Sequence, residues 1–231
     1  MSQESDATGG VERGVNAGKA AIFDLDGTLL DSMGIWREID RRFFGRRHIE
    51  MPADYAAHVA SMQTGAIAQY TVERFNLQES AQDLVDEWND DAQLLYAIAV
   101  SPKPHAVSYL RSLRESGARL AVATSLPPRL REAALGHAQM KDYFDHVCSV
   151  DDAHSKGKEE PDIYLLAASR LGIEPSHCTV FEDLLIAVKS AHRAGMKAWA
   201  MYDESSASDW DAITREADGA IRDFAQAPQL L

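Results

Sequence analysis

The chain has 231 residues, of which 45% are hydrophobic and 26% are charged, an ordinary composition for a globular protein with a sizeable core. Its formal net charge of −13 argues against nonspecific binding to nucleic acid or to an anionic membrane surface, because both partners are themselves negative. No segment approaches the roughly twenty consecutive apolar residues of a membrane helix, and the N-terminus lacks the basic and then apolar order of a secretory signal. We therefore expect a cytoplasmic protein.

The first segment, residues 1–19, is rich in Gly, Ser, Glu and Asp and nearly lacks apolar side chains, which predicts a flexible tail. After it, short apolar runs alternate with stretches of helical periodicity. This alternation predicts an α/β fold with a Rossmann-like, doubly wound parallel sheet and right-handed crossovers. The expected strands are residues 20–23, 119–123, 146–150, 178–181, 197–201 and 219–221, and the expected helices between them are residues 104–116, 128–135, 162–171 and 184–194.

Residues 33–101 interrupt the alternation, because apolar residues there recur only at helical spacing. Ser80 and Asp83 resemble a capping box at the start of the last helix of this stretch. We expect an inserted all-α cap of about four helices, joined to an α/β core made of residues 20–32 and 102–231. Ordinary core helices of a single domain are the alternative, but an insertion directly after an acidic turn favours a lid.

That acidic turn follows the first expected strand and contains Asp24 and Asp26. A turn at Gly27 allows the chain to bring both carboxylates to one pocket. Two neighbouring carboxylates repel each other, so ionising both is unfavourable unless a cation joins them or one keeps its proton. A solvated acidic turn without chemical function would show the same pattern, so the other strand ends have to decide between the two interpretations.

Polar residues stand at these other strand ends as well. Thr124 and Ser125 come at the end of the second expected strand, Glu182 and Asp183 come at the end of the fourth, and Lys158 lies in the loop after the third. Ligands of open parallel sheets bind beyond the carboxyl ends of the strands. Carboxylate oxygens suit Mg²⁺, while a hydroxyl and an ammonium group suit phosphate oxygens. Each residue alone could serve as a helix cap or a solvated side chain, but together they predict a metal-assisted phosphoryl site.

In this order, the segments resemble the four signature motifs of the haloacid dehalogenase (HAD) superfamily, and in particular its β-phosphoglucomutase-like phosphatase branch with a helical C1-type cap. The resemblance extends from residue 20 to about residue 225. The four motifs are Asp24-Leu25-Asp26-Gly27-Thr28-Leu29-Leu30-Asp31-Ser32, Thr124-Ser125, Lys158-x-x-Pro161-Asp162 and Phe181-Glu182-Asp183.

The resemblance implies a role for each motif residue. Asp24 would be the nucleophile that forms an aspartyl-phosphate, and Asp26 would be the general acid and then the general base. Thr124 would hold the phosphate with the help of backbone N–H groups near Leu25, Asp26 and Ser125. Lys158 would pair with both the nucleophile and the phosphate. The implied Mg²⁺ site consists of Asp24, the main-chain carbonyl of Asp26, Glu182 and Asp183.

The chain departs from the family pattern after the fourth motif. Family members usually continue with Asp-Ser-x-x-Gly, whereas this chain has Leu184 and Ala187 at the serine and glycine positions. Leu184 removes a polar group next to an implied metal ligand. In the third motif, Glu159 replaces the usual first proline.

The expected function is a Mg²⁺-dependent phosphatase that acts on a small phosphorylated metabolite. By the resemblance, an acid at Asp26 favours phosphate transfer over dehalogenation. A sugar phosphate mutase is one alternative, although the His after the first motif and the Arg-containing cap loop of such mutases are absent from Met33-Gly34-Ile35-Trp36 and from residues 61–65. A catalytically silent HAD-like binding protein, motivated by Leu184 and Ala187, is another. A receiver-type signalling module would lack the insert.

Two further expectations concern the cysteines and the assembly. Cys148 and Cys178 lie in apolar segments without C-x-x-C spacing, which predicts buried and reduced thiols. The sequence carries no sign of the oligomeric state, and a monomer is the default expectation.

Overall fold

The structure is a computed structural model that describes residues 14–59, 62, 64–155 and 157–231. The chain divides into two compact units. The core unit consists of the segment that ends at Asp31 together with Ser101–Leu231, and the helical unit consists of Ser32–Val100. Among the described residues, no helix combines the length and apolar character that spanning a bilayer requires.

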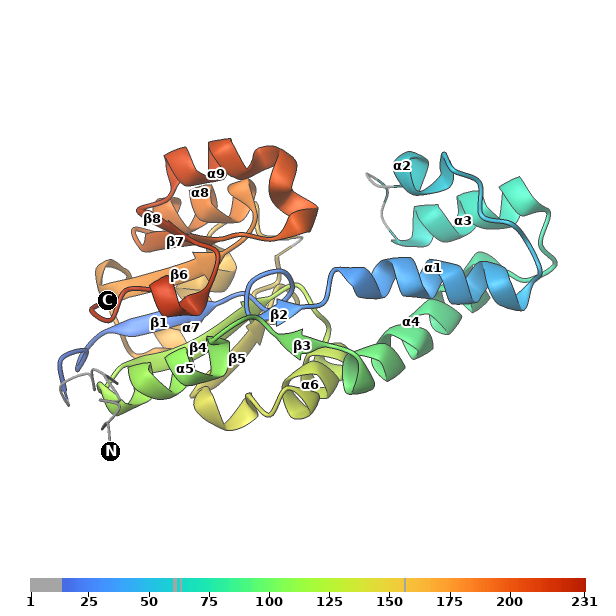
Figure 1. The fold of residues 1–231 in the computed structure, drawn as a ribbon. Helices are drawn as coiled ribbons and strands as arrows, with labels where there is room; N and C mark the ends of the chain where they lie inside the picture. The colour runs from blue at the N-terminus through green and yellow to red at the C-terminus, as the bar shows by residue number, and fades with distance from the viewer. Residues whose placement is uncertain (1–13, 60–61, 63, 156) are drawn as a thin grey trace, which may run out of the picture. The chain divides into compact units, whose positions relative to one another are not determined.

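Within the described residues, a sheet of six parallel strands forms the centre of the core unit, in the order β5-β4-β1-β6-β7-β8 (Figure 1). Strand β1 lies between β4 and β6, so that Phe23 pairs with Val122 on one side and with Phe181 on the other. All carboxyl ends therefore meet at one edge of the sheet. The strands are β1 (Ala20–Phe23), β4 (Arg119–Thr124), β5 (His146–Ser149), β6 (Cys178–Glu182), β7 (Lys197–Met201) and β8 (Gly219–Ile221).

Successive side chains of a strand point to opposite faces, and both faces of this sheet are covered by helices. On one face, Ile22 belongs to an apolar cluster shared with helices α7 and α8. On the other face, Phe23 stacks on Phe181 at 4.7 Å and makes an edge contact with Tyr109 of α5 at 6.3 Å between ring centroids. The predicted α/β fold is thus confirmed. The helices are α5 (Ala106–Glu115), α6 (Pro128–His137), α7 (Asp162–Leu171), α8 (Leu185–Arg193) and α9 (Trp210–Glu216), with 3₁₀ turns at Lys141–Tyr143, Pro175–His177, Glu204–Asp209 and Phe224–Gln226.

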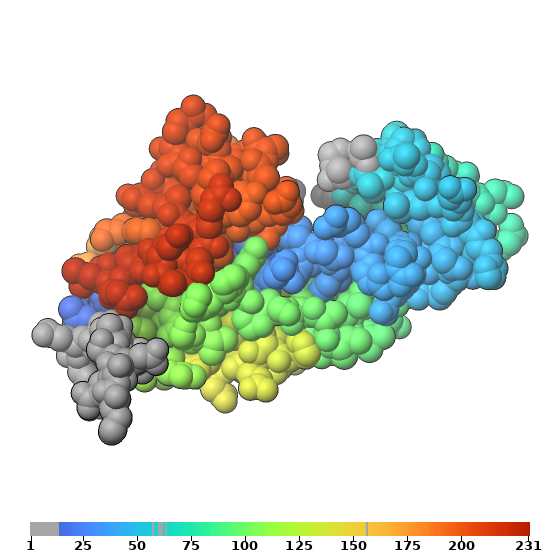
Figure 2. All heavy atoms as spheres, in the orientation of Figure 1, coloured from blue at the N-terminus to red at the C-terminus, as the bar shows by residue number. Residues whose placement is uncertain are grey.

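The C-terminal segment lies against helix α5, as the adjoining red and green surfaces in Figure 2 show. The Tyr109 hydroxyl donates a hydrogen bond to the carbonyl oxygen of Pro228 at 2.8 Å. The backbone N–H of Phe224 donates to the carbonyl oxygen of Pro104 at 3.2 Å. These bonds attach the end of the chain to the core unit.

Residues 14–19 are not a flexible tail, contrary to the expectation. Asn16 is fully buried, and its side-chain amide donates to the Ser116 hydroxyl at 2.9 Å and to the Gln229 carbonyl at 2.8 Å. The backbone N–H of Leu231 in turn donates to the Asn16 side chain at 3.0 Å. These partners are distant in sequence, so local composition gave no sign of them. The rest of the expected tail, residues 1–13, lies outside the described residues.

A pair of two-residue strands, β2 (Leu30–Asp31) and β3 (Ser101–Pro102), forms where the chain leaves and re-enters the core unit. Their pairing is antiparallel, with Leu30 opposite Pro102. Segments of two residues are too short to give a strand pattern in the sequence, and this pair was not predicted.

The helical unit contains α1 (Gly34–Arg46), α2 (Tyr55–Val59), α3 (Thr64–Phe75) and α4 (Ala81–Ile98). The predicted capping box is present, because the Asp83 backbone N–H donates to the Ser80 side chain and the Asp83 carboxylate accepts from the Ser80 backbone N–H. Edge-to-face contacts of Phe43 with Phe44 and Trp88, at 5.2 Å and 5.5 Å between ring centroids, form part of the core of this unit.

Candidate active site

The centre of the candidate site is a buried ammonium group between two buried carboxylates. Asp24 directly follows β1, Glu182 is the last residue of the adjacent strand β6, and Lys158 lies in the loop before α7. The Lys158 Nζ donates hydrogen bonds to Asp24 Oδ1 and to Glu182 Oε1. Burial alone would lower the pKa of Lys158, but the charges of the two carboxylates outweigh it and raise this pKa above its ordinary value. Lys158 is therefore a permanent cation at this edge of the sheet.

Asp183 adds a third carboxylate, which the turn after Asp24 holds in place. The Thr28 hydroxyl donates to Asp183 Oδ1 at 3.2 Å. Gly27 has a φ of +81°, and a Cβ atom at this position would lie 2.5 Å from Asp183 Oδ2. A glycine is thus required here both by the left-handed backbone and by the close approach of the carboxylate.

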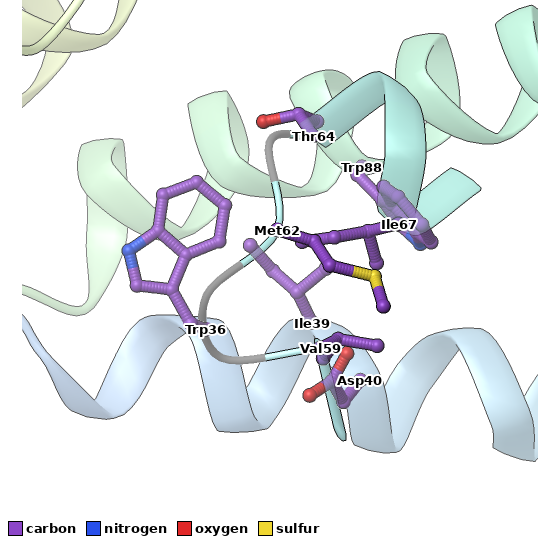
Figure 3. A pocket seen from close by; sticks show the side chains of 8 residues that line it. All are labelled: Trp36, Ile39, Asp40, Val59, Met62, Thr64, Ile67 and Trp88. Atoms are coloured by element: carbon purple, nitrogen blue, oxygen red, sulfur yellow. The ribbon is translucent and has the colours of Figure 1, made fainter. Parts of the chain in front are cut away.

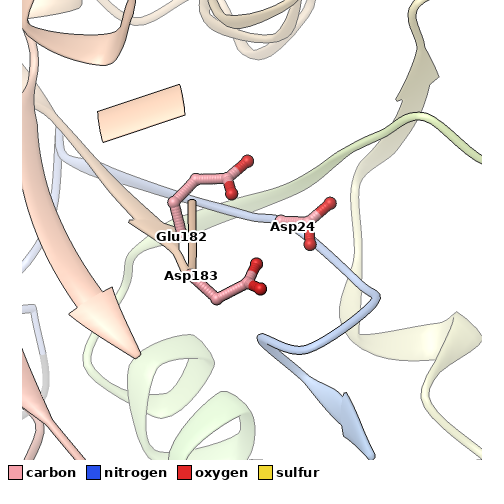
Figure 4. A group of neighbouring side chains, drawn as sticks. All are labelled: Asp24, Glu182 and Asp183. Carbon is pink, nitrogen blue, oxygen red and sulfur yellow. The ribbon is translucent and has the colours of Figure 1, made fainter. Parts of the chain in front are cut away.

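The three carboxylates could together hold a metal ion. Ligand oxygens of Asp24, Glu182 and Asp183 all lie within 4.8 Å of one another, and the side chains are neighbours in Figure 4. With Lys158 included, the formal charge of the group is −2. Glu182 Oε2 is buried and accepts no hydrogen bond from the described residues.

The pKa values of two of these carboxylates are raised, mainly because both are buried. Burial raises the pKa of Glu182 above its ordinary value although Lys158 opposes this, and burial together with the charge of Asp24 raises the pKa of Asp183. A buried group with two formal negative charges and an unused carboxylate oxygen has the donor set of a divalent-cation site. The residues present therefore fit Mg²⁺.

The remaining sequence-predicted residues lie at the same edge of the core unit. Thr124 is the last residue of β4 and is buried, and its hydroxyl oxygen accepts the backbone N–H of Leu126 at 3.1 Å. Ser125 is exposed and Asp26 is half-buried. Asp26 also forms an isolated bridge with Leu30, which closes the turn after β1.

Sequence reasoning missed Tyr164 of α7, whose hydroxyl donates to Glu182 Oε1 at 2.8 Å. Its position three residues after Pro161 of the third motif was the available signal, but an aromatic residue in a helix is more often a packing residue. It also missed Lys103 and Asp203, which form an ion pair of 2.6 Å in the core unit. Asp203 stands two residues after the end of β7, where a polar residue at a strand end could have drawn attention to it.

A separate pocket of about 350 Å³ lies within the helical unit. Of the eight described residues that line it, only Asp40 is charged, and burial raises the pKa of Asp40 to about 6. The cap loop at residues 61–65, which lacks the Arg expected of a mutase, is described only in part, because residues 61 and 63 lie outside the described residues. Figure 3 shows the lining side chains, which are Trp36, Ile39, Asp40, Val59, Met62, Thr64, Ile67 and Trp88.

Comparison with known proteins identifies the family. The model of the haloacid dehalogenase-like hydrolases matches residues 19–195. The chain belongs to this family. The resemblance of the four motifs to the HAD superfamily is thereby confirmed, and the buried carboxylates described above lie within the matched residues.

Two curated HAD-family relatives are similar over most of their length. The chain is 33% identical over 180 residues to fructose-1-phosphate phosphatase YqaB of Escherichia coli, which covers 77% of this chain and 93% of that protein. It is 32% identical over 212 residues to validoxylamine A 7′-phosphate phosphatase of Streptomyces hygroscopicus subsp. limoneus, which covers 90% of this chain and 95% of that protein. Among solved structures, β-phosphoglucomutase from Clostridium difficile matches with a TM-score of 0.67 at 18% identity, over 91% of this chain and 93% of that one. This last likeness concerns the fold.

Proposed function

We propose that the chain is a Mg²⁺-dependent phosphatase that hydrolyses a small phosphorylated metabolite through an aspartyl-phosphate on Asp24. The observation that carries this proposal is the buried Lys158, which bonds to Asp24 and to Glu182 at the carboxyl edge of the sheet, with the Asp183 carboxylate within 4.8 Å of both carboxylates. The family membership and the named phosphatases among the relatives support the same reaction class.

Asp24 is the nucleophile in this proposal. The ammonium group of Lys158 donates a hydrogen bond to Oδ1 of Asp24 and fixes this oxygen, so that Oδ2 is left to attack phosphorus. Asp26, two residues further along the turn, is half-buried and takes the role of general acid for the leaving group and general base for the water. Thr124 at the end of the neighbouring strand and the backbone at Ser125 bind the phosphate oxygens.

Asp24, the main-chain carbonyl of Asp26, Glu182 and Asp183 would hold the Mg²⁺. When bound, the ion supplies positive charge that allows a phosphate dianion to enter a group of carboxylates. Lys158 alone leaves that group negative.

The helical unit is the proposed cap, and its pocket is the proposed element of substrate selection. The walls of this pocket are largely apolar and Asp40 is the one charged group among its described lining residues. Such a pocket suits a compact metabolite that carries a hydrogen-bond donor on an apolar body.

Free, buried Cys148 and Cys178 agree with the proposed cytoplasmic location, where thiols stay reduced.

The test is hydrolysis of a panel of phosphorylated metabolites by full-length protein with Mg²⁺, compared with Asp24→Asn and with the exposed control Asp211→Asn. We expect turnover by the wild type and by Asp211→Asn, loss of turnover in Asp24→Asn, and a phosphoryl adduct on Asp24 after acid quenching. Unchanged activity of Asp24→Asn would refute the covalent mechanism.

Two other outcomes would favour the alternatives. Conversion of β-glucose 1-phosphate to the 6-phosphate would identify a mutase. Folded, Mg²⁺-replete protein that turns over no member of the panel would favour the silent binding protein.

A further inference from the structure

The carboxylate of Glu182 is held asymmetrically. Its Oε1 atom accepts two hydrogen bonds, one from Lys158 Nζ and one from the hydroxyl of Tyr164 at 2.8 Å. Its Oε2 atom accepts none from the described residues. Glu182 and Tyr164 are both completely buried, so solvent does not compete for these bonds.

The two donors come from one short segment. Lys158 lies in the loop before α7, and Tyr164 is the third residue of that helix. Ile163 and Ala167 of α7 pack in the apolar cluster beneath the sheet, together with the ring of Tyr164. A phenylalanine would fill the same space, and the hydroxyl adds only the bond to Glu182.

We propose that Tyr164 is a positioning residue for the metal site: its hydroxyl and Lys158 fix Glu182 Oε1, so that Oε2 is presented to a divalent cation. Partners of this kind orient carboxylate ligands in metal sites, and their loss typically weakens metal binding about 10- to 100-fold. The inference rests on the metal site of the proposed function. It assigns a role to a residue outside the segments by which the sequence resembles the HAD motifs.

The test is direct binding of Mn²⁺, as a paramagnetic substitute for Mg²⁺, to the full-length protein by electron paramagnetic resonance. We expect about 10- to 100-fold weaker binding to Tyr164→Phe than to the wild type. The matched control is Tyr109→Phe, which also removes a tyrosine hydroxyl from the core unit, in this case one bonded to the Pro228 carbonyl at 2.8 Å. This control should bind Mn²⁺ as the wild type does. Thermal unfolding of both variants reports any general loss of structure, and Tyr164→Leu is a second variant without the hydroxyl.

A double-mutant cycle with Glu182→Gln tests whether Tyr164 acts through Glu182. If it does, Tyr164→Phe weakens Mn²⁺ binding much less in the Glu182→Gln background than in the wild type. Equal weakening in both backgrounds would refute the proposed route. Folded Tyr164→Phe that binds Mn²⁺ as tightly as the wild type would refute the inference alone, whereas a wild type without any bound Mn²⁺ would refute the metal site of the proposed function as well.

Discussion

Gly27→Ala is a sharp test of the geometry around Asp183. The residue has a φ of +81°, and a Cβ atom added to it would lie 2.5 Å from Asp183 Oδ2 and 2.9 Å from Asp183 Cγ. The substitution therefore changes two things at once, the backbone energy of the turn and the space left for a carboxylate of the candidate metal site.

The two effects have different sizes and different consequences. A residue with a Cβ atom in the left-handed region costs about 1–2 kcal/mol of stability. Restoring an ordinary contact requires Asp183 to retreat by about 1 Å, which also breaks its 3.2 Å hydrogen bond with Thr28. A displaced ligand of this kind should weaken metal binding roughly 10- to 100-fold and lower kcat/KM by a comparable factor.

The control is Gly195→Ala, because Gly195 has a φ of +79° and a Cβ atom there would meet nothing within 4 Å. Urea unfolding should show a similar backbone cost in both variants, while Mg²⁺ titration of activity and Mn²⁺ binding should change only in Gly27→Ala. Equal metal affinity in Gly27→Ala, Gly195→Ala and the wild type would refute the reasoning that the turn and Asp183 are in contact.

Three further substitutions test other parts of the molecule. Lys158→Met removes the cation between two buried carboxylates and should cost about 3–5 kcal/mol of stability together with most phosphatase activity; a variant as stable and active as the wild type would contradict the buried ion pairs. Thr124→Val removes a hydroxyl at the edge of the sheet and should weaken competitive inhibition by inorganic phosphate about 10-fold, whereas a loss of stability without a change in this inhibition would indicate a purely structural hydroxyl. Since burial raises the pKa of Asp40 to about 6, the native state binds this proton more tightly than the unfolded chain, and the contribution of Asp40 to wild-type stability falls as the pH rises from about 4 to about 6. Asp40→Asn should remove this fall. Because the side chain is partly exposed, the difference in unfolding free energy between Asp40→Asn and the wild type should change by about 1 kcal/mol in favour of the variant between acid and neutral pH. A difference that urea unfolding finds to be independent of pH would contradict the shift.

The sheet could be predicted because both of its faces are buried, so that its strands are short apolar runs in the sequence. Strand ends were harder to predict. Thr124 and Glu182 are polar, yet they still pair as strand residues with Ser149 and Ala200. Backbone pairing does not depend on the polarity of a side chain, so a strand can continue past the first polar residue. The apolar run by which the sequence predicts the strand ends before that residue.

Features that depend on long-range partners were not predicted. The polar residues around Asn16 are typical of a disordered tail, and only the distant Ser116 and Gln229 make Asn16 a buried residue. Tyr164 is similar, because its spacing in α7 indicates packing while its hydroxyl bonds to Glu182 on a neighbouring strand. The motif residues could be named in advance, whereas the residues that orient them could not.

Leu184 shows why a departure from a family pattern has to be judged in three dimensions. In the sequence it removes a polar group next to Asp183, which motivated the silent alternative. In the structure its backbone is extended just before α8, and the residue is 45% exposed. Its carbonyl oxygen accepts the backbone N–H groups of Ala187 and Val188, a function that any residue at this position can perform. Asp183 is held by the hydroxyl of Thr28, a contact in which the side chain of residue 184 takes no part. The substitution at 184 therefore gives no structural reason to expect a displaced Asp183 carboxylate.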